Sequence, residues 1–508
     1  MGGKYLIGLD NGGTVVKAGL YDTAGNAAAF ASAEVNTLLG REGAVERDMD
    51  ELWHMNAHAI RKLLEKTGID PKDILSLAVS GHGNGIYLVG ESGRPVRNGI
   101  YSSDTRAKDT VRRYVKEGIY DKIQPRTLQN LYAGQTAVLL AYLAAHEPET
   151  LNKAKWAFTC TDYIRFCLTG EAHGELTNMS VISAMDQYAR QYDEEVFAAL
   201  GIREYMRLMP PIRQSCEICG CVTKMAALET GLAEGTPVAG GLFDGTACAI
   251  AAGITDSKKL CVVAGTWSIN EFIRKTPVVS RDLFLTSVYC IDGYYMITEG
   301  SMTSASNLEW FIRRFLNEEK RQMKEQGKSI YDAANLMVAS VQPGDSSIVF
   351  LPFLYGTNVN PDAKACFLGV SGWHDKAHIL RAIYEGVVFS HFAHAERLYA
   401  FRDAPPESVR IAGGVTNSGV WVQMFADMFQ LPVEVSAVGE LGTLGAAMCA
   451  GVAAGAYGSL AEASEACAKK AYTCSPDPSK KETYRKKYSL YKKILNALEP
   501  VWGDWRQF

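Results

Sequence analysis

The stretch G-L-D-N-G-G-T-V-V-K-A-G-L-Y-D, residues 8–22, decides the fold. An apolar segment ends at Asp10, an N-G-G-T turn follows, and a β-rich segment begins directly after the turn. A dinucleotide-binding loop needs a helix at this point, and the sequence lacks the G-x-G-x-x-G spacing of such loops. The pattern therefore predicts a strand–turn–strand hairpin and disfavours a nicotinamide- or flavin-dependent oxidoreductase.

A second stretch, K-L-C-V-V-A-G-T-W-S-I-N-E-F-I at residues 259–273, has the same form. It reads as an apolar strand, a Gly-Thr turn and a β-rich strand. Two such hairpins about 250 residues apart predict two related lobes, each beginning with one hairpin. We place the boundary near Gly253, so that the lobes comprise residues 1–253 and 254–508.

The bulk properties narrow the class of protein. A chain of 508 residues is too long for one hydrophobic core, which also favours two domains. The net charge of -4 gives no reason to expect a nucleic-acid partner. No apolar run is long enough to span a bilayer, and the first strand begins almost at Met1, which leaves no room for a signal peptide. We therefore expect a cytoplasmic protein without a membrane partner.

The twelve cysteines are scattered, which is typical of reduced thiols in a chain of this length. One group, C-E-I-C-G-C, brings together Cys216, Cys219 and Cys221. A structural zinc site usually takes four ligands in two spaced pairs, and no second Cys or His pair follows at a suitable distance. Incidental thiols are the preferred interpretation of this group.

Glycine-rich turns between strands present backbone N–H groups that can bind phosphate. The first turn offers Gly12, Gly13 and Thr14, and Lys17 follows on the next strand. A simple hairpin is the alternative, because Asn-Gly is a common hairpin dipeptide. Asp10, at the end of the first strand, has the hard oxygen ligands that Mg²⁺ prefers.

Two later glycine turns also carry candidate residues. Asp244 follows a short strand and precedes small, helix-compatible residues, so it is either a helix N-cap or a general base for a hydroxyl nucleophile. Gly413 and Gly414 lie between a strand and a helix that we expect to start near Asn417. This turn is either a tight connection or a flat surface for a purine ring.

A third group of polar residues follows glycine-rich breaks and could bind a polyol. The group comprises His82, Asn84, Asp104 and Arg106. Each type of residue is also common in loops, and Asp104 with Arg106 could form only a surface ion pair. The residues alone leave these alternatives open.

Together these features resemble the FGGY carbohydrate kinases, within the superfamily of actin, Hsp70 and hexokinase. The resemblance extends over nearly the whole chain. Its most specific part is A-C-F-L-G-V-S-G-W-H-D-K-A-H-I-L-R-A-I-Y-E, residues 365–385, which fits the C-terminal pattern of the family. The hairpins, the G-x-x-D element and the A-G-G-x-x-x-N loop also occur in the family's order. The N-terminal pattern departs at Leu139 and Tyr142, where the family has lysine and tryptophan.

The resemblance implies a two-lobed α/β fold of the actin, hexokinase and ribonuclease H type, with ATP, Mg²⁺ and a sugar between the lobes. Asp244 would act as the catalytic base, and Asp10 would hold the metal. The implied nucleotide-binding residues are Gly12, Gly13, Thr14, Lys17, Gly265, Thr266, Gly413, Gly414 and Asn417. The implied sugar-binding residues are His82, Gly83, Asn84, Asp104 and Asp244. A homodimer is also compatible with the family.

Within the family, the stretches V-E-R-D-M-D-E-L-W, Y-S-S-D-T-R-A and Y-E-G-V-V-F-S-H resemble the L-xylulose kinase branch. D-Xylulose kinases carry Met-His where this chain has Gly83 and Asn84, which argues against D-xylulose. We therefore expect a ketopentose kinase, with L-xylulose as the first choice. The alternatives are another pentulose, a polyol such as erythritol, and a non-enzymatic nucleotide switch of the actin and Hsp70 type.

Overall fold

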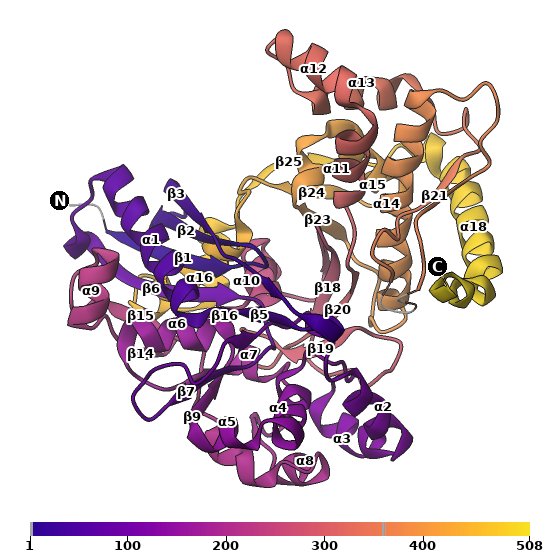
Figure 1. Cartoon of the computed structure of the whole chain (residues 1–508). Coiled ribbons are helices and arrows are strands. Elements are labelled where there is room, and N and C mark those ends of the chain that lie inside the picture. Colours follow the sequence, from indigo (N-terminus) through magenta and orange to yellow (C-terminus); the bar gives the residue numbers. More distant parts are fainter. Residues whose placement is uncertain (1–3, 358–359, 361, 508) are drawn as a thin grey trace.

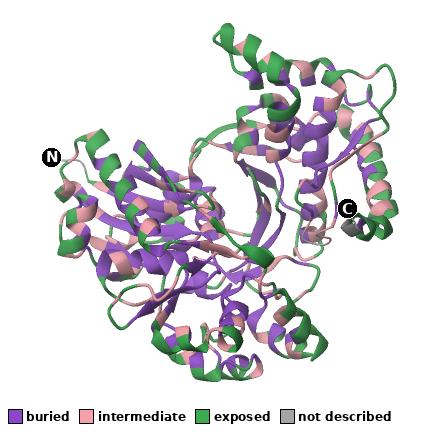
Figure 2. Ribbon diagram, in the orientation of Figure 1, coloured by how far each residue is buried: buried purple, intermediate pink, exposed green. Residues whose placement is uncertain are grey.

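The computed structural model describes residues 4–357, 360 and 362–507. The chain forms two lobes, each built around a seven-stranded mixed sheet (Figure 1). Buried residues concentrate in these sheets and in the helices packed on them, whereas the outer helices carry exposed faces (Figure 2). The two-lobed α/β architecture predicted from the paired hairpins is confirmed.

The first sheet begins with the predicted hairpin. Strand β1 pairs antiparallel with β2, and Asp10 stands opposite Lys17 across the pair. On its other side β1 pairs in parallel with β6, so the carboxyl ends of both strands meet at one edge of the sheet. The sheet order is β14 (Ile218–Cys221), β15 (Pro237–Ala239), β6 (Ile74–Gly81), β1 (Tyr5–Asn11), β2 (Val15–Asp22) and β3 (Ala27–Glu34), with β16 (Leu242–Phe243) also pairing with β6.

The second sheet repeats this arrangement. Strand β17 pairs antiparallel with β18 and in parallel with β23, as β1 pairs with β2 and β6. The sheet order is β19 (Leu285–Val288), β20 (Tyr295–Ser301), β18 (Ser268–Arg274), β17 (Lys259–Ala264), β23 (Ser408–Ala412), β24 (Val433–Ser436) and β25 (Lys470–Cys474). The hairpin therefore occupies the same place in each sheet, as its recurrence in the sequence predicts.

Two helices connect the lobes. Helix α10 (Asp244–Ala251) follows β16, and helix α16 (Leu441–Ala453) follows β24 of the second sheet. Both helices pack together, and α16 lies against β1 and β6 of the first sheet (Figure 1). Residues 441–453 belong by sequence to the predicted second lobe, but they cover the sheet of the first.

Small residues permit this close approach. A Cβ atom on Gly8 would lie 1.8 Å from the carbonyl oxygen of Thr443, and one on Gly445 would lie 2.2 Å from that of Ala247. A Cβ atom on Gly442 would lie 2.4 Å from Oδ2 of Asp10. These distances are below van der Waals contact, so the glycines are required where α16 meets the first sheet and α10.

Helix α1 (Met49–Thr67) covers β2 and β3 with an apolar face that includes Leu52 and Leu63. The side chain of Asp48 caps it by accepting from the N–H of Glu51 at 3.0 Å. The Glu51 carboxylate in turn accepts from the side chain of Asn36 at 2.6 Å.

The remaining elements extend the two lobes. Those of the first lobe are β4 (Leu38–Leu39), β5 (Val45–Arg47), β7 (Tyr87–Gly90), β8 (Gly99–Ile100), α2 (Lys108–Lys116), α3 (Ile119–Thr127), α4 (Thr136–His146), α5 (Pro148–Lys153), β9 (Ala154–Phe158), α6 (Cys160–Thr169), β10 (Gly174–Glu175), α7 (Leu176–Met179), β11 (Met185–Asp186), β12 (Gln191–Tyr192), α8 (Glu194–Ala199), β13 (Ile212–Arg213) and α9 (Lys224–Thr230). Residues 105–200 are mainly helical, with β9 as the main interruption.

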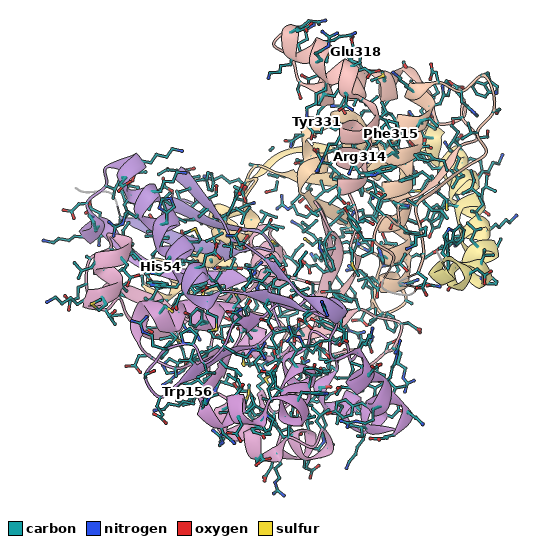
Figure 3. The ribbon with its side chains drawn as sticks, viewed as in Figure 1. His54, Trp156, Arg314, Phe315, Glu318 and Tyr331 are labelled. Atoms are coloured by element: carbon teal, nitrogen blue, oxygen red, sulfur yellow. The ribbon has the colours of Figure 1, made fainter. Side chains whose placement is uncertain are left out.

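The second lobe adds an outer group of helices. These are α11 (Ser306–Phe315), α12 (Asn317–Glu325), α13 (Ile330–Ser340), α14 (Lys376–Tyr399), α15 (Gly419–Phe429), α17 (Leu460–Cys467) and α18 (Lys481–Leu498), with strands β21 (Val349–Leu351) and β22 (Cys366–Leu368). Figure 3 places the side chains of Phe315 and Tyr331 on the projecting α11–α13 group. The family-specific stretch at residues 365–385 forms β22 and the first part of the long, largely buried helix α14.

Candidate active site

The first hairpin turn presents two unused amide donors. Gly13 and Thr14 are exposed, and the N–H groups of both residues lack a hydrogen-bond acceptor within the described part of the chain. The turn is closed instead by the N–H of Gly12, which donates to the carbonyl of Val15 at 3.1 Å. Adjacent free amides of this kind form a concave site that suits an anionic phosphate.

The second hairpin turn has the same chemistry. Its carbonyl groups are occupied, because Gly265 accepts from the N–H of Ala305 at 2.8 Å and Thr266 accepts from that of Ser304 at 2.9 Å. The N–H groups of Thr266 and Trp267 have no acceptor among the residues described, and both residues are exposed. Each lobe therefore offers a pair of free donors at the tip of its hairpin.

The Gly413–Gly414 loop lies directly against the second hairpin. Gly413 has φ 94°, and a Cβ atom there would lie 2.6 Å from the carbonyl of Ala264 and 2.8 Å from the nitrogen of Gly265. Both the left-handed backbone and the lack of space require glycine at position 413. Gly414 and Asn417 are exposed, and the helix that follows starts at Gly419, close to its predicted start.

Asp244 is the first residue of α10 and is partly exposed. Burial, followed by repulsion from the Asp10 carboxylate, raises the pKa of Asp244 to about 7. Its Oδ1 accepts from the N–H of Gly245 at 2.7 Å. The N-cap of α10 is Phe243, so the alternative prediction of Asp244 as the N-cap is wrong. A carboxyl group that titrates near neutral pH is suited to accept a proton from a hydroxyl.

Asp10 and Glu271 complete an acidic group around Asp244. Burial raises the pKa of Asp10 to about 6, with Glu440 adding to this effect and Lys17 opposing it. Burial also raises the pKa of Glu271, on β18, to about 8, and the Asp244 charge contributes. Three carboxyl groups from both lobes therefore interact electrostatically at the junction of α10 with the sheets.

The described residues contain no group of three His, Cys, Asp or Glu side chains arranged to hold a metal ion. This holds for Cys216, Cys219 and Cys221 as well, where Cys216 instead lies 3.8 Å from the thiol of Cys449 on α16. The carboxylates at positions 10 and 244 still fit Mg²⁺, because this ion is usually bound through one or two carboxylates with phosphates and water.

Lys17 does not point freely toward the hairpin tip. Its ammonium group forms an ion pair with Glu440 at 2.7 Å, just before α16. The side chain is 41% exposed, so it can exchange this partner for a phosphate at little cost. Binding of phosphate by Lys17 stays a prediction.

The loop at residues 82–84 approaches the catalytic candidate. A Cβ atom on Gly83 would lie 2.8 Å from the ring of Phe243, so this loop packs on the residue before Asp244. Asn84 has φ 63°, and its side chain is hydrogen-bonded to Tyr132. His82 is buried, and burial, helped by the positive charge of Arg47, lowers its pKa to about 3. His82 is therefore neutral and able to donate one hydrogen bond and accept another.

Asp104 is less available than its neighbours. Its side chain has no exposed surface and accepts from the N–H of Val45 at 2.7 Å and that of Arg106 at 2.8 Å. The Arg106 guanidinium binds the same carboxylate and also Glu46. The ion pair is thus buried rather than superficial, and it positions the loop that carries Tyr101. A direct contact between Asp104 and a sugar stays a prediction.

Several residues at this site were missed by sequence reasoning. Tyr101 makes an edge contact with His82, with 4.5 Å between ring centroids. Burial raises the pKa of Tyr101, and the Asp244 charge adds to this effect. Tyr132 and Glu271 interact with the same carboxylate. Tyr101 begins the stretch Y-S-S-D-T-R-A, which also contains Asp104 and Arg106, and this position is the signal that could have found it.

The comparisons with known proteins agree with this geometry. Residues 5–251 match the N-terminal domain of the FGGY family of carbohydrate kinases, and residues 260–454 match its C-terminal domain. A probable L-xylulose kinase of Pasteurella multocida is 36% identical over 98% of this chain and 100% of its own length. An L-xylulose/3-keto-L-gulonate kinase of Escherichia coli is 38% identical over 98% and 97%.

Solved structures support the fold. A xylulose kinase from Lactobacillus acidophilus superposes with a TM-score of 0.89 at 23% identity, covering 99% of this chain and 100% of the other. The Plasmodium falciparum glycerol kinase gives 0.84 at 18% identity, covering 97% and 98%. Within the described residues, no helix combines the length and apolarity that crossing a membrane requires. The family matches cover most of the chain, which therefore belongs to the FGGY family of carbohydrate kinases and is a sugar phosphotransferase.

Proposed function

We propose that this enzyme transfers the γ-phosphate of ATP to a hydroxyl group of L-xylulose. The proposal of phosphoryl transfer rests on the two hairpins with free amide donors, one in each lobe. It rests also on the carboxyl group of Asp244, whose pKa is raised. The choice of L-xylulose rests on the names of the relatives that are 36% and 38% identical over nearly the whole chain.

The nucleotide would lie with its phosphates against the two hairpins and its adenosine against the exposed surface of Gly414 and Asn417. The free amides at Gly13, Thr14 and Thr266 would donate to phosphate oxygens. Mg²⁺ would be held by Asp10, with phosphates and water as its other ligands, and would neutralise charge that develops on the phosphates.

The proposed reaction is a direct displacement. Asp244, ionised at neutral pH and above, would accept the proton of the sugar hydroxyl as its oxygen attacks the γ-phosphorus. The bond between that phosphorus and the bridging oxygen breaks, and ADP leaves with the electron pair. His82, Gly83 and Asn84 would orient the sugar, since their loop packs beside the base. Closure of the lobes would exclude water and limit wasteful hydrolysis.

The substrate is tested by ADP release coupled to NADH oxidation, with L-xylulose, 3-keto-L-gulonate, D-xylulose and erythritol at equal concentrations. We expect the largest kcat/KM for L-xylulose. A larger value for another pentulose, or for erythritol, would overturn the substrate assignment, and one relative that is 28% identical is named an erythritol kinase. ADP release that no sugar or polyol stimulates would overturn the kinase proposal and favour a nucleotide switch.

We also propose that the enzyme acts in the cytoplasm as a homodimer, without nucleic-acid or membrane partners. The homodimer rests on resemblance to the family, and the net charge of -4 gives no reason for a polyanionic partner. Light scattering after size-exclusion chromatography measures the mass in solution. A value near 55.5 kDa, the mass of one chain, would overturn the dimer.

A further inference from the structure

Arg47, the last residue of β5, has no exposed surface. Its guanidinium lies over the ring of Tyr101, 4.4 Å from the ring centre. Within the described chain it forms no ion pair with a carboxylate, and its Nε has no hydrogen-bond partner. Burying a positive charge among neutral groups is unfavourable, so an arginine here needs a compensating function.

The guanidinium contacts the first hairpin through two backbone carbonyls. Nη1 donates to the carbonyl of Gly12 at 3.4 Å, and Nη2 donates to the carbonyl of Gly13. In a trans peptide the C=O and the N–H point in opposite directions. Holding these two carbonyls toward Arg47 therefore turns the N–H groups of Gly13 and Thr14 away from it, and these are the two donors that lack an acceptor.

In the second hairpin, the carbonyls of the turn are held by other donors. There the carbonyls of Gly265 and Thr266 are held by the backbone N–H groups of Ala305 and Ser304, with no charged side chain involved. In the first hairpin, among the residues described, no backbone N–H donates to the carbonyls of Gly12 and Gly13. Arg47 thus supplies donors to turn carbonyls that receive none from the backbone, whereas backbone N–H groups supply them in the second hairpin.

We propose that Arg47 is a positioning residue that holds the first hairpin in its phosphate-binding conformation. It adds a positive charge on the side of the turn opposite the free N–H groups. This charge gains its missing anionic partner when a polyphosphate binds. The inference rests on the proposed function in one respect, namely that a nucleotide polyphosphate binds at this hairpin. It adds a residue and a role that the hairpin glycines alone do not supply.

The test measures binding rather than turnover. Isothermal titration of the full-length protein gives Kd for ATP with Mg²⁺ and for adenosine, which has no phosphate to reach the hairpin. We expect Arg47→Gln to weaken ATP binding about 10- to 100-fold, the range for losing charge-assisted hydrogen bonds. Adenosine binding should stay within about twofold, and Arg47→Lys should recover part of the ATP affinity, since it keeps the charge.

Arg61→Gln is the matched control. Arg61, on α1, also donates to backbone carbonyls, including that of Glu229 at 3.0 Å, but it is exposed. It should leave both dissociation constants unchanged. If Arg47→Gln does not fold, Arg47→Lys alone decides, with at least about threefold weaker ATP binding expected because one ammonium cannot hold both carbonyls.

Two results would overturn the inference. One is unchanged ATP affinity in both Arg47 variants, and the other is an equal loss for ATP and adenosine, which would indicate general damage to the fold. Neither result would affect the proposed function, because the wild-type protein would still bind ATP. Failure of the wild-type protein to bind ATP would instead reject the proposed function itself.

Discussion

Replacing Asp244 with asparagine should make the enzyme slower and, at alkaline pH, more stable. The variant keeps the size of the side chain and its acceptor for the N–H of Gly245, but it cannot take a proton. Loss of a positioned base lowers the rate by about 10²–10⁴. We therefore expect kcat for the sugar to fall by this factor, while KM for ATP changes little.

The gain in stability follows from the pKa of the same group. In the folded protein the pKa of Asp244 is about 7, against an ordinary value of 3.8. The folded state thus holds the proton more tightly than the unfolded state. The stability that this proton contributes is full below pH about 4 and is lost as pH rises to 7. The difference between these two pKa values corresponds to roughly 4 kcal/mol of folding free energy as an upper limit.

The assay is the melting temperature of the nucleotide-free protein between pH 5 and 8.5. We expect the difference between Asp244→Asn and wild type to grow across this range by a few degrees, in favour of the variant. Wild-type kcat/KM should rise with pH through about 7 over the same interval. A variant with wild-type turnover, or a stability difference that does not depend on pH, would refute the assignment of the base.

Three further substitutions test the surroundings of this group. Asp10→Asn removes the like charge that adds to burial in raising the pKa of Asp244. The rise of the variant's residual kcat/KM with pH should therefore occur at lower pH than in the wild type. An unchanged pH dependence would contradict the interaction between the two carboxylates. Gly442→Ala forces a Cβ atom within 2.4 Å of the Asp10 carboxylate. It should lower the free energy of unfolding, measured in denaturant, by about 1–3 kcal/mol. Gly344→Ala is the control and should not, because a Cβ atom there has no atom within 4 Å. Gly413→Ala conflicts with φ 94° and should raise KM for ATP at least about tenfold with KM for the sugar unchanged; equal increases would argue against an adenosine-side role.

The fold could be predicted from the sequence because its deciding features are local. The turns at Gly12–Thr14 and Gly265–Thr266 are each flanked by apolar strands, and their recurrence predicts two lobes. The position of α16 could not be predicted in the same way. The small residues of 441–453 indicate close packing, but they do not say that the partner is a strand more than 400 residues earlier in the chain.

Candidate site residues could be proposed from the sequence where a residue stands next to a turn of special geometry. Asp10, Asp244 and Gly413 are of this kind, and the structure brings each to the ends of the central strands. Arg47 and Tyr101 lie on short strands and loops whose positions depend on tertiary packing. Short strands and loops have no apolar periodicity that would indicate which of their charged side chains are buried. For the same reason the sequence does not predict that Asp104 is fully buried.

The most direct test of the central claim follows the fate of the phosphate. The wild-type enzyme is incubated with Mg²⁺, L-xylulose and ATP labelled in the γ-phosphate, and the products are separated and identified by mass. We predict one labelled sugar phosphate for each ADP formed, and loss of this product in Asp244→Asn. Label found only in inorganic phosphate, or ADP formed at the same rate without sugar, would contradict the assignment of this protein as a sugar kinase.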